Sequence, residues 1–240
     1  MFGIFVESLR PMKKYLVKYF FEFVVIVLGI SVSFYINEAK KTKEFTQLSK
    51  NIQQNLLNEI YNIEKYIQER ELVLREDIET LSSIWNVNIG TDSLIQLNNS
   101  KKLNIGAAIF YFRGFKPPAS VYNSLVNDGS LRYVKSLKVK EGLDKMHNID
   151  DYNFNQFIEG EEVVKNKIVT YLQIHYPNII INGFNNKNNK TLKNLKKAVD
   201  KDLTLRAFLA EKRSAMRLKM AAIKNYKDSL EKVKEILLKP

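Results

Sequence analysis

The sequence has 240 residues, of which 45% are hydrophobic and 27% charged, enough for one domain with an anchor or for two small domains. This length excludes a large multidomain machine, and the absence of cysteine excludes disulfide scaffolds, thiolate metal sites and cysteine nucleophiles. The formal net charge of +12 favours an anionic partner, either nucleic acid or the head groups of an anionic bilayer.

Helix is the expected secondary structure over most of the chain. The 5 prolines and 9 glycines gather in a few places, so long stretches contain no helix breaker. We therefore predict an all-α fold, in which an N-terminal transmembrane helix continues into a long helix packed in an extramembrane helical bundle. The expected division is an interfacial segment at 1–14, a transmembrane helix at 15–37, a helix leaving the membrane at 38–88, a loop and apolar segment at 89–118, and a helical bundle domain with a long C-terminal helix at 119–240.

The transmembrane helix is predicted from an uncharged stretch at 23–36 (FVVIVLGISVSFYI), which the preceding aromatic residues extend to about 18 residues, or roughly 27 Å of helix. Lysine and tyrosine side chains flank it as interfacial anchors: Lys14, Lys18, Tyr19, Tyr35, Lys40 and Lys41. A cleaved signal peptide and a buried core helix are the alternatives. No good cleavage site follows, and the apolar residues cover all faces, so a membrane anchor is preferred.

Glu22 is the unusual residue of this helix, because a carboxylate near the bilayer edge is unfavourable unless it reaches water or a partner. Lys18 lies one turn earlier, and an interfacial ion pair between the two is the simpler interpretation. The other interpretation is a self-association surface, since steps of four and three residues place small and polar groups on one face. The residues predicted to associate are Glu22, Gly29, Ser33 and Asn37.

The orientation of the helix is nearly balanced, because four basic residues lie on each flank. The short basic N-terminal segment contains a single acid, Glu7, which favours a cytoplasmic N-terminus and a periplasmic C-terminal domain. Residues 1–9, ended by Pro11, are predicted to form an interfacial helix before the span.

Beyond the membrane segment, apolar residues at nearly heptad spacing predict one helix to about Trp85. Packing on its own domain is preferred to an intermolecular coiled coil. Residues 86–104 are expected to form a loop with a short helix, and the apolar residues 105–115 are expected to be helical.

The second half is predicted to contain helices at 119–127, 131–136, 138–147 and 148–176, with Gly129 as a left-handed cap and Pro177 as a stop. Residues 178–190 form an asparagine-rich loop. A final helix at 192–238 is expected to pack antiparallel to the helix that leaves the membrane.

The final helix is strongly basic, with lysine and arginine side chains placed between its apolar positions. A solvated helix face is the preferred interpretation, followed by binding to anionic lipid or to an acidic partner. Nucleic acid is not expected as a partner, because no recognised fold or interleaving of basic and aromatic residues supports it.

Two stretches resemble a known family, namely 22–37 (EFVVIVLGISVSFYIN) and 118–135 (PASVYNSLVNDGSLRYVK), together with the charged helix between them. They are similar to uncharacterised single-span proteins of Bacteroidota-type bacteria, classed as a domain of unknown function. The matching residues of the second stretch are Tyr122, Leu125, Gly129, Leu131 and Lys135. Here Glu38, Ala39 and Lys40 follow Asn37, where the family continues Asn-Trp-Asn. The resemblance implies a bacterial inner-membrane anchor with a helical domain. It does not point to any particular activity.

No pattern of catalytic or ligand-binding residues is present in the sequence. The two histidines, His147 and His175, are far apart in sequence, and the acidic clusters at 69–79 and 159–162 are typical of helix surfaces. We therefore expect no enzyme activity, cofactor or metal.

The leading hypothesis is a non-catalytic scaffold or interaction subunit in the lipid bilayer, which forms a homo-oligomer through its transmembrane helix or binds another membrane protein. The alternatives are a membrane sensor or signal transducer, and a channel or proton-handling subunit that uses Glu22.

Overall fold

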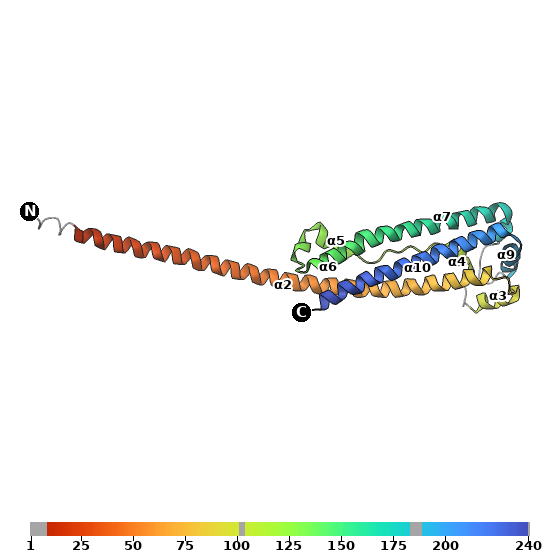
Figure 1. The fold of residues 1–240 in the computed structure, drawn as a ribbon, viewed down its shortest axis with the longest axis horizontal. Coiled ribbons are helices and arrows are strands. Elements are labelled where there is room, and N and C mark those ends of the chain that lie inside the picture. Colours follow the sequence, from red (N-terminus) through yellow and green to blue (C-terminus); the bar gives the residue numbers. More distant parts are fainter. Residues whose placement is uncertain (1–8, 101–103, 183–188, 240) are drawn as a thin grey trace, which may run out of the picture. The chain divides into compact units, whose positions relative to one another are not determined.

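The computed structural model describes the backbone of residues 9–100, 104–182 and 189–239, with side chains from residue 16 onward. Over these residues the chain is helical and has no strand, which confirms the predicted all-α fold (Figure 1). Its contacts divide it into two units, Met1–Ile52 and Gln53–Pro240, and each is described by itself.

The first unit consists of the N-terminal part of helix α2, which runs from Leu9 to Trp85. Pro11 lies in the first turn of α2, where a backbone N–H has no partner within the helix, so the missing N–H of proline is tolerated. The prediction that Pro11 ends a separate helix is therefore wrong. Residues 1–8 of the predicted interfacial segment lie outside the described residues. Among the residues described, α2 is the one helix long and apolar enough to cross a membrane, and none of its most apolar window, with a mean hydropathy of 2.1, is buried.

The second unit is built on three long helices: the part of α2 after Gln53, α7 (Asp151–His175) and α10 (Leu203–Leu238). Gln53 near the start of this part of α2 donates a hydrogen bond to the carbonyl of Leu237, at the end of α10. Trp85 at the other end of α2 packs under the guanidinium of Arg206, 5.0 Å from the ring centre. The predicted antiparallel pairing of these two helices is therefore confirmed.

Helix α10 presents two heptad rows to the core. One row is entirely apolar and includes Leu209, Met216, Ile223, Leu230 and Leu237. The other contains Leu205, Lys212, Lys219, Tyr226 and Val233, and it too is buried throughout. Two lysines therefore lie at positions where a coiled-coil pattern places apolar side chains.

An extended segment at 111–119 takes the place of a fourth helix. It follows α4, which ends at Phe110, so the helix predicted over 105–115 is correct only for its first part. Arg113 of the segment bonds to Asp77 of α2, and the backbone N–H of Lys116 donates to the Tyr66 hydroxyl at 2.7 Å. The segment runs along α2 in the opposite direction.

Short helices close the end of the bundle nearest to Gln53. Helix α5 (Ser120–Asn127) is capped by Glu59 of α2, whose carboxylate accepts the N–H groups of Val121 at 2.6 Å and Tyr122 at 3.0 Å. Gly129 has a φ of 71°, the left-handed conformation predicted for it. The helix predicted at 131–136 is instead one 3-10 turn, η1 (Ser130–Tyr133).

The two helices predicted at 138–147 and 148–176 form one continuous helical path. It comprises α6 (Leu137–Asp144), the π-helical turn η2 (Lys145–Asp150) and α7. No glycine or proline separates them, and the wider π turn absorbs the change in register. Lys145 bridges this turn to α10 through the Ser229 hydroxyl at 2.8 Å.

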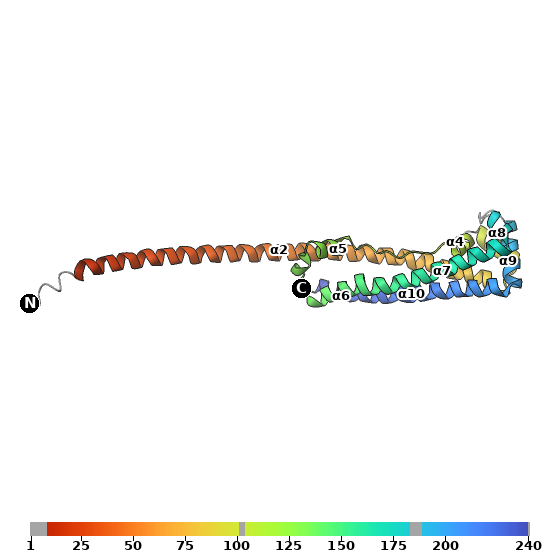
Figure 2. The same ribbon diagram turned by 90° about the horizontal axis from the view of Figure 1, so that it is seen from above.

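The opposite end of the bundle, which we call the distal end, is formed by α3 (Thr91–Asn99), α8 (Pro177–Ile181) and α9 (Asn189–Lys201) (Figure 2). Pro177 begins α8, so the predicted loop is shorter, and 183–188 lie outside the described residues. The predicted final helix is interrupted at Asp202, whose side chain accepts the N–H groups of Thr204 and Leu205 and so starts α10.

Candidate functional site

The residues predicted for membrane-helix association all lie on the exposed surface of α2. Glu22, Gly29, Ser33 and Asn37 are exposed, and a Cβ atom added at Gly29 would meet nothing within 4 Å. The Glu22 carboxylate lies 3.8 Å from the Lys18 ammonium, as the interfacial interpretation expects. All four positions are therefore accessible, and nothing in the described chain covers Gly29.

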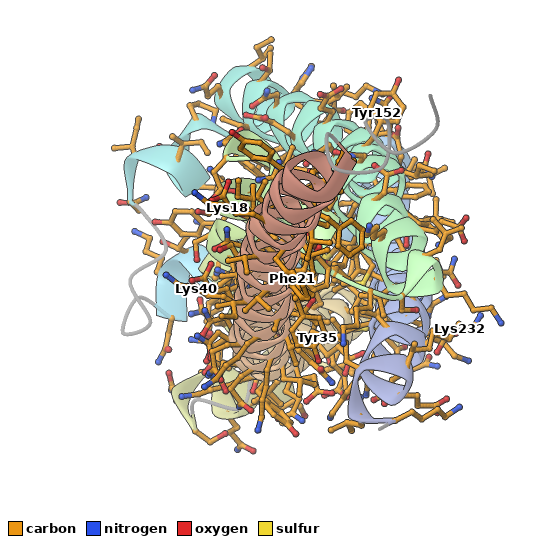
Figure 3. All side chains as sticks on the ribbon, turned by 90° about the vertical axis from the view of Figure 1, so that its left-hand side faces the viewer. Lys18, Phe21, Tyr35, Lys40, Tyr152 and Lys232 are labelled. Atoms are coloured by element: carbon orange, nitrogen blue, oxygen red, sulfur yellow. The ribbon has the colours of Figure 1, made fainter. Side chains whose placement is uncertain are left out.

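The predicted anchors are also exposed where they are described. Figure 3 looks along α2 from its N-terminal end, with Lys18, Tyr35 and Lys40 labelled. Tyr19 and Tyr35 expose 62% and 77% of their surface. The Lys41 ammonium lies 3.4 Å from the Glu38 carboxylate. The Lys14 side chain lies outside the described residues.

A cluster of ionisable side chains lies buried in the second unit. The buried charge cluster consists of Asp77 of α2, Arg113 of the extended segment, Glu161 of α7, and Lys212 and Lys219 of α10. Four of these side chains are essentially inaccessible, and Arg113 is about one quarter exposed. The interpretation of the basic residues of the last helix as a solvated face is wrong for both lysines, as is the surface assignment of Asp77 and Glu161.

Lys212 holds the start of the extended segment by its backbone. Its ammonium donates to the carbonyl oxygens of Ile109 at 2.7 Å and Tyr111 at 2.8 Å. Burial lowers the pKa of Lys212 to about 8, although the charges of Glu161 and Asp77 oppose the shift. A neutral amine keeps two N–H donors, so both carbonyl bonds remain possible after deprotonation.

Lys219 lies two turns further along α10 and pairs directly with a carboxylate. Its ammonium donates to Glu161 Oε2 and to the carbonyl of Arg113. Burial lowers the pKa of Lys219, and the charge and hydrogen bond of Glu161 partly restore it. The other carboxylate oxygen of Glu161 is buried and has no partner among the described residues.

Arg113 connects the cluster to α2 through a two-point contact. Its Nε lies 2.8 Å from one carboxylate oxygen of Asp77, and its terminal nitrogen lies 3.3 Å from the other. The hydrogen bond to Asp77 raises the pKa of Arg113. This paired geometry fixes the orientation of the guanidinium plane.

The contacts of the buried charge cluster are made with the chain's own carbonyls and carboxylates. The carbonyls of Tyr111 and Arg113 lie in the extended segment and that of Ile109 lies in the last turn of α4, so they have no helical N–H partner, and the two lysines supply the donors. Phe115, next along the segment, stacks on Phe154 with ring centres 4.1 Å apart. The cluster therefore clamps the extended segment to the three long helices. Sequence reasoning missed the cluster; the one signal for it is the heptad row that places Lys212 and Lys219 on the same helix face as apolar residues.

The residues on which the predicted family resemblance of 118–135 rests have structural roles in this fold. Tyr122 and Leu125 are buried on α5, and the Tyr122 ring stacks on His147 with centres 4.3 Å apart. Gly129 supplies the left-handed turn, Leu131 is half-buried and Lys135 is exposed. Burial lowers the pKa of His147, which favours its neutral form.

A cavity of about 340 Å³ lies at the distal end between α8 and α9. Tyr176 and Lys197 contribute to its wall, as does His175, which lies at the end of α7. The Tyr171 and Tyr176 hydroxyls donate to the same carboxylate oxygen of Asp202, at 2.9 and 2.8 Å respectively. The hydrogen bond from Tyr176 to Asp202 is the main reason that the pKa of Tyr176 rises to about 12.

Metal-binding geometry is absent from the part of the chain that the structure describes, where no three histidine or acidic side chains gather as a metal site. The His147 ring stacks on Tyr122, whereas the His175 ring contacts Tyr171 in a tilted arrangement, so the two histidines belong to different clusters. No family model, curated protein or solved structure matches this chain.

Proposed function

We propose that this chain is a non-catalytic, membrane-anchored interaction subunit, held in a bacterial inner membrane by α2 and presenting the helical bundle as a binding surface. The observation that carries the proposal is the exposure of the apolar part of α2. None of its 18-residue apolar window is buried in the chain itself, so water, lipid or another helix must cover it. An exposed apolar helix surface of this length is unfavourable in water and favourable in a bilayer.

Self-association through α2 is the second part of the proposal. Gly29 and Ser33 leave space beside the helix backbone, which lets a second helix approach closely. The ion pair of Lys18 and Glu22 supports an interfacial position for Glu22 and gives less support to a channel or proton-handling subunit. No described contact favours the sensor alternative over the scaffold.

Crosslinking of the detergent-extracted full chain tests self-association. Gly29→Leu fills the space on the proposed contact face, and we expect it to reduce the crosslinked dimer at least about fivefold, or roughly 1 kcal/mol. Val27→Leu enlarges the opposite side of the same helix and is the matched control. Equal crosslinking of wild type and Gly29→Leu would remove the self-association claim.

Protease accessibility of tags at both termini tests anchoring and orientation together. We expect both the protein and its tags to remain with the membrane after carbonate extraction. The C-terminal tag should be cleaved from the periplasmic side and the N-terminal tag protected. Release into the soluble fraction would contradict the anchor, and a protected C-terminal tag would reverse the orientation.

The channel alternative is tested by Glu22→Gln in a liposome flux assay. Under the interaction-subunit proposal this change alters insertion or assembly only and leaves the ion permeability at the background level. A wild-type flux above background that Glu22→Gln abolishes would favour the channel.

A further inference from the structure

The exposed face of α9 is strongly basic. Lys190, Lys193, Lys197 and Lys201 are exposed and follow one another at steps of three and four residues, which places them on one side of the helix. These four residues, here called the lysine stripe, cover about 17 Å at ~1.5 Å per residue. Buried leucine and valine side chains hold the opposite face of α9 against the bundle.

The charge of the lysine stripe is not neutralised within the described part of the chain, where no carboxylate lies within ion-pair distance of its four ammonium groups. The single acid of α9, Asp200, forms an ion pair with the buried Lys196, whose ammonium lies 2.6 Å from the Asp200 carboxylate. Other partly exposed lysines of the bundle do have acidic partners, such as Lys167 with Glu211 at 3.1 Å. The stripe is therefore a concentrated, uncompensated cationic surface.

The distal cavity lies directly beside the stripe. Lys197 and Lys201 belong to its wall, while Tyr176, Pro177 and Ile179 supply an apolar part. Its volume of about 340 Å³ is at the lower end for small-ligand pockets and suffices for one large side chain. The surface thus combines a row of positive charges with one adjacent apolar recess.

We propose that the lysine stripe and the distal cavity form a docking surface for an acidic segment of a partner protein. Carboxylates of the partner lie along the stripe, and one aromatic or aliphatic side chain occupies the cavity. This inference rests on the proposed function and specifies it, because it names the chemistry of the partner that the interaction subunit binds.

Two other polyanions fit the position less well. A bilayer surface presents anionic head groups but no single apolar side chain that would fill the recess beside the stripe. Single-stranded nucleic acid requires several aromatic rings on which bases stack. The cavity wall offers one tyrosine, Tyr176, whose hydroxyl is already bonded to Asp202.

Fluorescence anisotropy with the full chain in zwitterionic nanodiscs tests the docking surface. The probe is a labelled peptide of aspartate and glutamate with one central phenylalanine, about eight residues long, which spans ~26 Å when extended. We expect Lys197→Gln combined with Lys201→Gln to weaken binding about tenfold or more, and we expect added salt to weaken binding of the wild type.

Matched controls separate this site from general electrostatic attraction. Lys224→Gln combined with Lys232→Gln removes the same charge from exposed positions of α10 and should change affinity less than about twofold. Replacing the phenylalanine of the peptide with serine should weaken binding to the wild type but change little for the stripe variant. Equal losses from both pairs of substitutions would overturn the proposal.

Competition identifies the class of ligand. Tighter binding of an oligothymidylate or of anionic phosphatidylglycerol vesicles than of the acidic peptide would overturn the assignment to a protein partner. The stripe variants should remain in the membrane and crosslink through α2 as the wild type does. A stripe variant that loses peptide binding but still crosslinks therefore reports on the docking surface alone. Loss of membrane association would instead contradict the proposed function.

Discussion

At the scale of single residues, the main finding is that the bundle buries charges instead of placing them all on its surface. Removing one member of a buried ion pair strongly destabilises a protein, because the charge of the other member is then buried without compensation. The ammonium of Lys219 and the carboxylate of Glu161 are both inaccessible to solvent, so we expect the loss of either charge to be strongly destabilising.

The substitution Glu161→Gln tests the buried pair. We expect it to lower the free energy of unfolding by about 3 kcal/mol, because the Lys219 ammonium keeps a hydrogen-bond acceptor but loses its counter-charge. Chemical denaturation monitored by circular dichroism measures the change. Glu159→Gln removes a charge from an exposed position two residues earlier and should change stability by less than about 0.5 kcal/mol.

Lys212 predicts a pH dependence of stability. Its pKa is about 8 in the folded chain against 10.5 without burial, so between these values the unfolded chain binds more protons. Stability from this group therefore rises with pH over that interval, by up to about 3 kcal/mol, and below about pH 8 the full penalty of burying the charge applies.

Denaturation of wild type and Lys212→Met at a series of pH values checks this expectation. The difference in unfolding free energy between the two should grow in favour of the wild type as pH rises from about 8 toward 10.5. Lys224→Met, at an exposed position, should show no such trend relative to the wild type. A pH-independent difference for Lys212→Met would mean that Lys212 has an ordinary pKa in the folded chain.

At the scale of elements, two glycines within helices have opposite roles. A Cβ atom at Gly142 of α6 would lie 2.5 Å from Val233 Cγ2 on α10, whereas at Gly160 of α7 it would meet nothing within 4 Å. Gly142 thus permits the close approach of α6 to α10. Gly160 has no such packing function in the bundle.

Replacing each of these glycines with alanine separates packing from helix propensity. Gly142→Ala should destabilise the bundle by about 1–3 kcal/mol through overpacking, and Gly160→Ala should stabilise it by about 0.5–1 kcal/mol. Thermal unfolding measures both changes. Val233→Ala in the Gly142→Ala background should recover part of the loss, and a simple sum of the two single effects would exclude a direct contact.

At the scale of the whole molecule, the N-terminal unit, which contains the apolar part of α2, and the bundle are separate units, so changes in one should leave the other unaffected. We expect Gly29→Leu to change crosslinking but not the unfolding midpoint of the bundle, and Glu161→Gln to do the reverse. Both variants should be measured in both assays in the same detergent. A shift of the unfolding midpoint by Gly29→Leu would show that the two units are coupled.

The sequence by itself determined the helical class, the apolar stretch of α2, the end of that helix at Trp85, and the antiparallel course of the last helix. These features depend on local periodicity and on scarce helix breakers, which a single sequence displays directly. It also predicted the left-handed Gly129, because the Asn-Asp-Gly sequence has few other uses at a helix end.

The tertiary structure alone decided what fills the space between the three long helices. Residues 111–115 are apolar enough for a helix, yet they are extended, because lysines from a distant part of the chain satisfy their carbonyls. Whether Lys212 and Lys196 are solvated or buried depends likewise on the elements that pack over them. Periodicity specifies which face of a helix is covered, but only the assembled fold specifies which groups cover it, and those groups set the charge, the pKa and the partner of each buried side chain.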